Sequence, residues 1–289
     1  MISMCPVRFA VCNPQPFSMQ MRTHLVGPLA LMLAATLACR SESQHRRARP
    51  LEYIGSSTIA HAMHAVNDAE IDEQIDIDDQ AESVGGEEAI LTGQCDLAGY
   101  AGTPSQRVVK SGLEATWIGD DAIAVVVSTE RDLNGLSIGQ LRSIFSGEIE
   151  DWEQIDGAGT GRIKPLIVDR SSVTRKVFRA AVLGVRDYAG CEVVAPDAKI
   201  LARVAEDPNS IGQISASFPF DDKRVRVLAI DGVRATDRSG EYPITRPLYL
   251  LWWPGRERVA RLVSWLESPA GQSLLHDLYR ITPSHTEGS

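Results

Sequence analysis

Residues 122–128 read Ala-Ile-Ala-Val-Val-Val-Ser, a continuous run of apolar and mostly β-branched side chains. A run of this kind is typical of a strand that is buried on both faces of a sheet. A second run of the same character, Pro-Leu-Tyr-Leu-Leu-Trp-Trp, occupies residues 247–253. The two runs bracket a self-contained block of chain, and this arrangement predicts two lobes joined by a two-strand hinge.

Short predicted strands and helices alternate on both sides of these runs, which indicates an α/β fold. Hydrophobic periodicity and helix-end signals predict strands at 51–54, 95–99, 163–168, 212–217 and 225–230, and helices at 58–66, 86–91, 138–145, 173–182 and 256–278. We therefore assign residues 51–124 plus 231–289 to lobe 1 and residues 125–230 to lobe 2.

The first 38 residues contain no Asp or Glu, although the whole chain has 38 of them against 29 Lys and Arg. Within this segment, Arg22 precedes an apolar run over residues 25–38, which is the layout of an export signal. The run is too short to cross a bilayer as a helix. We predict a signal peptide over residues 1–38, with Met21 as an alternative start, followed by a polar tether over 39–50.

Ala38 directly before Cys39 resembles a bacterial lipobox, in which the cysteine carries the lipid anchor. Thr36 departs from that pattern, and an ordinary signal peptide cut nearby is the alternative. Once the signal peptide and the anchor are set aside, only Cys95 and Cys191 remain. We expect two buried free thiols, because a disulfide between the two lobes would lock the hinge.

The net charge of −9 argues against a nucleic-acid partner, since such binding depends on Lys and Arg that neutralise phosphates. The sequence has no nucleophile elbow, no zincin motif, no Walker loop and no Cys-x-x-Cys, so we expect no enzymatic activity and no cofactor. His61 and His64 share one face of a short helix, but no fourth ligand accompanies them and we expect no metal site.

Three segments share one local pattern, in which a strand ends, serines or threonines follow, and a helix begins. They lie around Ser56-Ser57-Thr58, around Ser83-Val84-Gly85-Gly86, and around Ser171-Ser172-Val173-Thr174. Helix N-termini expose unpaired N–H groups that bind oxyanions, and the hydroxyls add further donors. Each cluster alone is explained by helix capping, whereas three of them from two lobes predict an oxyanion site in the cleft.

The order of several motifs resembles the phosphate-binding proteins of bacterial ABC importers, over about residues 51 to 281. The motifs are Gly55-Ser-Ser-Thr-Ile59, Ser83-Val-Gly-Gly86, Asp96-Leu-Ala98, Leu141-Arg-Ser-Ile-Phe-Ser-Gly147 with Asp151-Trp152, Ser171-Ser-Val-Thr-Arg175, Ile211-Gly212 and Tyr242-Pro-Ile-Thr-Arg-Pro-Leu-Tyr249. The resemblance implies a type II periplasmic-binding fold. It also implies that the ligand is bound by the hydroxyls or backbone of Thr58, Ile59, Ser83, Ser172, Val173 and Thr174.

The sequence departs from the family's pattern at three points of the site. The ligand-binding Asp of the family aligns with Ala101, and its Arg aligns with Val168, although Arg170 lies two residues on and is a candidate to reach the same anion. The glycines of the family's Gly-Ser-Gly-Thr turn are also replaced. Asp169 and Glu87 are alternatives for the lost carboxylate, and the ligand is left open between phosphate and a fully ionised oxyanion such as sulfate.

By this resemblance the chain is an exported, monomeric solute-binding protein, periplasmic or on the cell surface and anchored through Cys39. It would capture phosphate or a related oxyanion and deliver it to ABC permease subunits by clamshell closure. Its only contact with the membrane would be the lipid anchor. The alternative is a sensory or adhesion lipoprotein with the same fold and lost or altered ligand binding.

Overall fold

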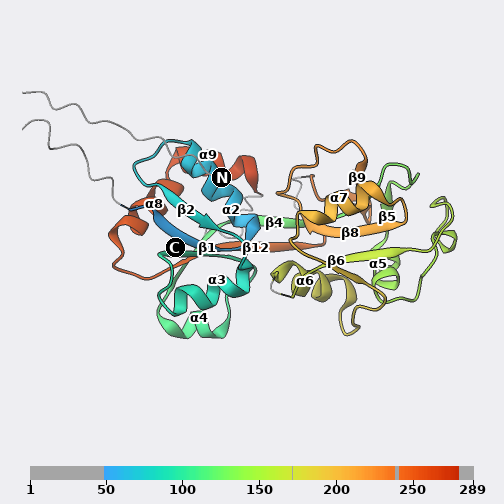
Figure 1. Ribbon diagram of the computed structural model, residues 1–289, viewed down its shortest axis with the longest axis horizontal. Coiled ribbons are helices and arrows are strands. Elements are labelled where there is room, and N and C mark those ends of the chain that lie inside the picture. The colour runs from blue at the N-terminus through green and yellow to red at the C-terminus, as the bar shows by residue number, and fades with distance from the viewer. Residues whose placement is uncertain (1–48, 171, 238–240, 280–289) are drawn as a thin grey trace, which may run out of the picture. The chain divides into compact units, whose positions relative to one another are not determined.

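The computed structural model describes residues 49–170, 172–237 and 241–279, all within one compact unit, Arg49–Ser289 (Figure 1). The predicted signal peptide, the alternative start Met21, Cys39 and most of the tether lie outside the described residues. None of the helices described is long and apolar enough to cross a membrane.

Most strands form one nine-stranded sheet in the order β2-β1-β3-β12-β4-β8-β6-β7, with β9 paired to β4, and three short strands form a second sheet in the order β11-β10-β5. The strands are β1 (Leu51–Gly55), β2 (Ile75–Asp78), β3 (Leu97–Ala101), β4 (Glu114–Ser128), β5 (Gly135–Leu136), β6 (Lys164–Val168), β7 (Glu192–Val194), β8 (Ser210–Ser215), β9 (Val225–Val227), β10 (Ala229–Ile230), β11 (Val233–Arg234) and β12 (Thr245–Trp252).

The helices connect these strands and cover the sheet. They are α2 (Ser57–Asp68), α3 (Glu82–Leu91), α4 (Gln106–Ser111), α5 (Ile138–Phe145), the 3₁₀ turn η1 (Trp152–Gln154), α6 (Val173–Phe178), which continues as the π-helical turn η2 (Arg179–Leu183), α7 (Lys199–Glu206), α8 (Glu257–Glu267) and α9 (Pro269–Leu278). Helix α3 begins four residues earlier than predicted, so Ser83 lies inside its first turn rather than ahead of it.

Strand β4 belongs to both halves of the main sheet, and it is about twice as long as the apolar run from which it was predicted. Its first half pairs with β12 up to Ala122, and its second half pairs with β8 from Ile123 onward. The side chains of residues 118–128 are all buried, as the uninterrupted apolar run predicted. One strand therefore passes from the first half of the sheet into the second.

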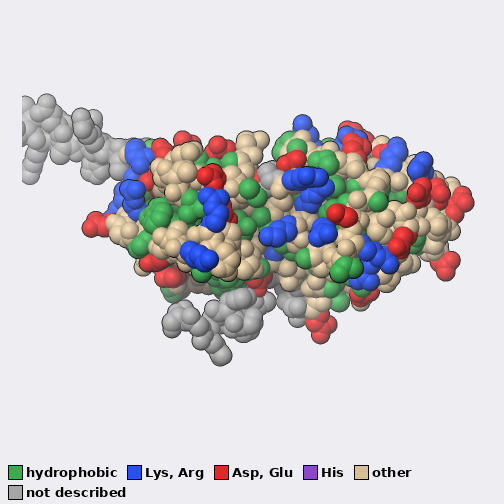
Figure 2. Space-filling view, turned by 90° about the horizontal axis from the view of Figure 1, so that it is seen from below, with side chains coloured by type: hydrophobic (Ala, Val, Ile, Leu, Met, Phe, Trp, Pro, Cys, Tyr) green, Lys and Arg blue, Asp and Glu red, His purple; other side chains and the backbone are tan. Residues whose placement is uncertain are grey.

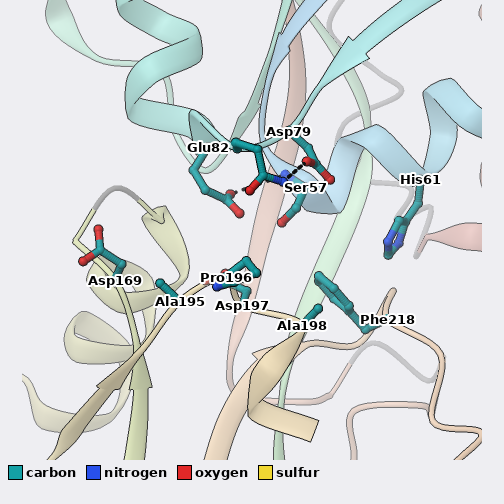
Figure 3. A pocket seen from close by; sticks show the side chains of 11 residues that line it. Ser57, His61, Asp79, Glu82, Asp169, Ala195, Pro196, Asp197, Ala198 and Phe218 are labelled. Carbon is teal, nitrogen blue, oxygen red and sulfur yellow. Dashed lines mark hydrogen bonds between the residues drawn. The ribbon is translucent and has the colours of Figure 1, made fainter. Parts of the chain in front are cut away.

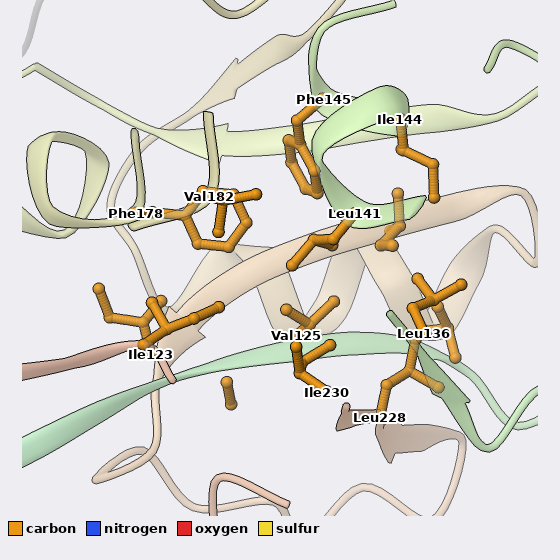
Figure 4. Packing of buried hydrophobic residues seen from close by; sticks show 14 of the residues in the cluster. Ile123, Val125, Leu136, Leu141, Ile144, Phe145, Phe178, Val182, Leu228 and Ile230 are labelled. Carbon is orange, nitrogen blue, oxygen red and sulfur yellow. The ribbon is translucent and has the colours of Figure 1, made fainter. Parts of the chain in front are cut away.

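Each half of the sheet has its own hydrophobic core, which defines the two lobes. The first core gathers side chains of α2, β1, β3, β12 and α8, among them Tyr53, Met63 and Leu262. The second core lies between α5, η2 and β4, where Phe145 packs edge-to-face on Phe178 with 4.9 Å between ring centroids (Figure 4). The α/β, two-lobed fold predicted from the sequence is confirmed.

The chain returns to lobe 1 later than the sequence suggested. Residues 231–244, which we expected in lobe 1, include Ala235, Tyr242 and Ile244 of the second core. The two crossings lie beside each other, because Ile123 N donates to Ile244 O at 2.8 Å and the Tyr242 hydroxyl donates to Ile123 O at 2.9 Å. The apolar residues of this return segment are too widely spaced in the sequence to reveal which core they join.

Cys95 and Cys191 are both free, as predicted, although Cys191 is only half-buried. Burial raises the pKa of the Cys191 thiol to about 11 and keeps it protonated at neutral pH.

Candidate functional site

The predicted hydroxyl donors lie at the ends of strands that point toward the junction of the two lobes. Thr58 is in the first turn of α2, directly after β1, and Ser83 is in the first turn of α3. Ser172 is the N-cap residue of α6, and Thr174 is in its first turn. All four residues are almost fully enclosed, with 1–3% of their surface exposed.

Helix α3 approaches β1 closely because Gly86 has no side chain. A Cβ atom at this position would lie 2.6 Å from Ile54 O, which is closer than real Cβ contacts allow. The close packing fixes the height of α3 over the strand ends and so places Ser83. The Ser83 hydroxyl accepts a hydrogen bond from Ala101 N at 3.1 Å. Ala101 is the residue that aligns with the ligand-binding Asp of the family.

A residue that we did not predict, Arg246 of β12, joins the donors from the two lobes. Its Nη2 atom donates to Thr58 Oγ1 of lobe 1 at 2.9 Å, and its Nη1 atom donates to Thr174 Oγ1 of lobe 2 at 2.8 Å. The Arg246 side chain is 1% exposed. A guanidinium group in this position supplies the positive charge that a set of neutral hydroxyls lacks.

Asp121 of β4 holds Arg246 in place. The two residues face each other in the β12–β4 register, and Asp121 Oδ2 lies 3.0 Å from Nε and 2.9 Å from Nη2 of Arg246. Burial raises the pKa of Asp121, and the adjacent guanidinium opposes that rise. The pair keeps the guanidinium aimed at the two threonines, because Asp121 holds Nε and one side of Nη2, while Nη2 also reaches Thr58 and Nη1 reaches Thr174.

A hollow of about 370 Å³ adjoins these donors and is lined from both lobes (Figure 3). Ser57, Asp79 and Glu82 line it from lobe 1, and Asp169 and Asp197 line it from lobe 2. The hollow thus carries four carboxyl groups, which is a surprising lining for an oxyanion site.

Two of these carboxyl groups have pKa values close to neutral pH. Burial, and after it the charge of Asp197, raises the pKa of Glu82 to about 7. Burial likewise raises the pKa of Asp197 to about 6, although the Ser172 hydroxyl donates to its Oδ2 atom at 2.9 Å. Near neutral pH the charge of the hollow therefore changes with small shifts in pH.

The remaining predicted residues differ in how they reach the site. Ile59 is fully buried in the first core, and its N–H group donates to Ser56 O at 3.1 Å. Val173 begins α6 and packs into a cluster made mostly of lobe 1 side chains. Arg170 is exposed and lies at a second hollow on lobe 2, which it lines together with Ser172, rather than at the inter-lobe hollow.

The two alternatives for a carboxylate and the two histidines are also placed. Asp169 lines the inter-lobe hollow, whereas Glu87 accepts a hydrogen bond from the Ser105 hydroxyl at 2.6 Å and so supports α4. His61 Nδ1 lies 3.1 Å from Ser217 O, and its ring packs edge-to-face on Phe218. Among the described residues, no three His, Cys, Asp or Glu side chains form a group that could hold a metal ion.

Two lobes joined by paired crossings, with buried donors converging from both sides, define a two-lobed ligand-binding protein. The chain belongs to the PBP superfamily, whose domain model matches residues 41–269.

Two proteins similar to this chain are phosphate-binding proteins. The phosphate-binding protein PstS of Bacillus subtilis is 32% identical over 147 residues, which are 47% of this chain and 47% of that protein. The phosphate-binding protein PstS of Borreliella burgdorferi is 22% identical over 189 residues, which are 60% of this chain and 67% of that protein. The alignment with the B. subtilis protein thus spans about half of either chain.

Among solved structures, a putative phosphate ABC transporter substrate-binding protein with bound phosphate from Clostridium perfringens superposes with a TM-score of 0.73 at 22% identity. The superposition covers 81% of this chain and 99% of that one. An ABC-type phosphate transport receptor from Vibrio cholerae superposes with a TM-score of 0.62 at 21% identity, covering 81% and 100%. These likenesses establish the fold.

Proposed function

We propose that this protein is an extracytoplasmic solute-binding protein that captures phosphate or a similar oxyanion between its lobes and delivers it to an ABC importer. The observation that carries the proposal is the buried contact of Arg246 with Thr58 of lobe 1 and Thr174 of lobe 2. The names of the relatives in B. subtilis and B. burgdorferi, both phosphate-binding proteins, support the choice of ligand class.

The proposed ligand set joins the predicted donors to the new arginine. It consists of the Arg246 guanidinium, the hydroxyls of Thr58 and Thr174 that Arg246 contacts, and the predicted hydroxyls of Ser83 and Ser172. The backbone N–H groups of Ile59 and Val173 were predicted to add to them. Charge-assisted hydrogen bonds from a guanidinium to an oxyanion are about twice as strong as neutral ones. The hydroxyls of Ser83 and Ser172 already have internal partners, so the ligand exchanges those hydrogen bonds for its own.

Lobe opening is part of the proposed mechanism because the donors are out of reach in this conformation. With 1–3% of each residue's surface exposed, the four hydroxyl residues cannot meet an ion from solvent unless the lobes separate. The paired crossings near residues 122–123 and 244–245 are the natural place for that rotation. Closure then brings donors from both lobes onto the same ion, and no bond of the ligand is broken.

Glu82 and Asp197 set the conditions under which an anion is held. When both are charged they repel it, and when protonated each carboxyl group can donate a hydrogen bond to an oxyanion oxygen. Because their pKa values are about 7 and about 6, the proposed site binds anions more tightly in mildly acidic than in alkaline solution.

We also propose that the protein is exported and held at the membrane by a lipid on Cys39. The support is the acid-free apolar run before this cysteine and the small Ala38 that precedes it. Mass spectrometry of the protein isolated from its native membrane tests this proposal. An N-terminal peptide that begins at an acylated Cys39 supports it, and one that begins elsewhere without lipid overturns it.

Calorimetric titration of the purified protein with phosphate, sulfate and molybdate tests the ligand proposal. We expect saturable heat with at least one of the three and a loss of about tenfold or more in affinity for Thr58→Ala, which removes one lobe 1 donor. Thr160→Ala is the matched control, because Thr160 is an exposed threonine that lines neither hollow. The absence of heat with all three ions would refute the proposed function.

A further inference from the structure

A second hollow, of about 290 Å³, lies on the lobe 2 surface beside α6 and η2. It is lined by Ser172, Asp187, Tyr188 and four cationic side chains, namely those of Arg170, Arg175, Lys176 and Arg179. Asp187 is the only carboxylate in this lining, and it pairs with Arg179 at 3.2 Å. The lining therefore holds three positive charges in excess.

The cations of this hollow are available to a ligand. Within the described part of the chain, Arg170, Arg175 and Lys176 form no ion pair with any carboxylate. Like charges that line one hollow repel each other, and an anion between them relieves the repulsion.

Arg175 is also held in a fixed direction. Its guanidinium carbon lies 5.3 Å from the centroid of the Tyr188 ring, and the Tyr188 hydroxyl donates to Arg175 O at 2.9 Å. A side chain that is already ordered loses less conformational entropy when it binds an ion. Arg175 and the buried Ser172 hydroxyl give the hollow a partly rigid wall.

The net charge of the side chains that line this hollow is positive, whereas the chain as a whole is negative. The chain has a net charge of −9, and the inter-lobe hollow is lined by four carboxyl groups. Figure 2 views the molecule from the side on which α6 lies in Figure 1, and it shows Lys and Arg side chains gathered there. Ser172 lines the basic hollow, and its hydroxyl donates at 2.9 Å to Asp197, which lines the inter-lobe hollow, so a single hydrogen bond connects the basic hollow to the proposed ligand site.

We infer that this basic hollow is a second anion-binding site, which takes a small dianionic oxyanion such as phosphate or sulfate on the outer side of Ser172. Arg175, Lys176 and Arg179 bind the oxygens, and Arg170 closes the hollow from the segment before α6. The site raises the local concentration of the anion beside the inter-lobe site, on a molecule whose overall charge repels anions. It does not depend on lobe closure, because its lining comes entirely from lobe 2.

The experiment uses the full-length protein with Thr58→Ala, which removes a donor of the inter-lobe site and leaves the basic hollow intact. Phosphate or sulfate is added at low ionic strength, and backbone amide shifts are followed by NMR. We expect saturable shifts in residues 175–188, with a binding constant that weakens as salt is added.

Two double variants, each made in the Thr58→Ala protein, then separate a site from general surface charge. Lys176→Gln/Arg179→Gln should weaken this binding at least about tenfold, since two charge-assisted hydrogen bonds are lost. Lys199→Gln/Arg203→Gln is the matched control on α7, because it also removes one unpaired cation and one cation paired with a carboxylate, at Glu192, and should change the binding less than about twofold.

Shifts confined to α2 and α3, or an equal loss in both double variants, would overturn the inference and leave the proposed function standing. Conversely, shifts in residues 175–188 of Thr58→Ala, together with no inter-lobe binding in the protein that keeps Thr58, would support the basic hollow and contradict the proposed function.

Discussion

The Arg246–Asp121 pair should be both a stability element and a binding element, and a double-mutant cycle separates the two. Arg246→Gln leaves Asp121, whose side chain is 2% exposed, without its charged partner. Removing one member of a buried pair typically costs about 3–5 kcal/mol, because the remaining charge stays buried. We expect Arg246→Gln to reduce the free energy of unfolding in urea by that amount.

The second arm of the cycle restores stability without restoring the site. Asp121→Asn combined with Arg246→Gln removes both charges, so the double variant should recover most of the lost stability, to within about 1–2 kcal/mol of the original protein. It still lacks the guanidinium that reaches Thr58 and Thr174, and we therefore expect its affinity for phosphate to stay at least about tenfold lower. Urea denaturation and calorimetry on the same samples measure the two quantities.

Two results would refute this reasoning. A loss of less than about 1 kcal/mol in Arg246→Gln would mean that the pair is not buried as described. Phosphate affinity equal to that of the original protein in the stable double variant would mean that Arg246 does not contribute to binding.

Three further predictions concern Glu82 and Gly86. Sulfate stays a dianion over this pH range, and it should bind at least about tenfold more weakly at pH 8 than at pH 6. Glu82→Gln should remove most of that difference in a calorimetric titration, and an unchanged pH dependence in the variant would contradict the role of Glu82. The raised pKa of Glu82 stabilises the fold at pH values below 4.5, the ordinary pKa of Glu, and this contribution is lost as the pH rises through about 7. Glu82→Gln should therefore raise the free energy of unfolding at pH 8, by on the order of 3 kcal/mol at most, and leave it unchanged at pH 4. Equal effects at both pH values would show that the pKa of this carboxyl group is not perturbed. Gly86→Ala places a Cβ atom 2.6 Å from Ile54 O and should cost about 1–3 kcal/mol in thermal unfolding, whereas Gly139→Ala, whose Cβ atom would lie 3.7 Å from its nearest neighbour, should cost less; the reverse order would rule out close packing of α3 on β1.

Residues that follow strands are the part of the candidate site that local sequence patterns could indicate. Thr58, Ser172 and Thr174 are recognisable because a buried strand, a polar cluster and a helix follow one another within a few residues, and this local pattern survives in the structure. Ser83 was found for the same reason, although the helix start was misplaced. The long apolar runs likewise predicted β4 and β12, and through them the division into two lobes.

Arg246 could not be predicted as a site residue because its role depends on contacts that are distant in sequence. It reaches Thr58 across 188 positions and Asp121 across 125. The segment Tyr242-Pro-Ile-Thr-Arg-Pro was one of the most specific points of resemblance, yet nothing in its spacing shows where the arginine side chain lies. Glu82 and Asp197 were missed for the same reason. The pKa of Glu82 is raised by burial and by the charge of Asp197 in the opposite lobe, and that of Asp197 by burial and by the charge of Asp169.

The central claim is that one oxyanion is held by both lobes at once, and a distance between the lobes tests it most directly. Spin labels are attached at Val109 in lobe 1 and Val185 in lobe 2, two exposed positions, after Cys95 and Cys191 are replaced by serine. Double electron–electron resonance then gives the distribution of distances with and without phosphate. The account predicts that saturating phosphate converts a broad distribution into one narrow, shorter distance. Phosphate that binds, as shown by calorimetry on the same labelled protein, without changing the distribution would contradict it.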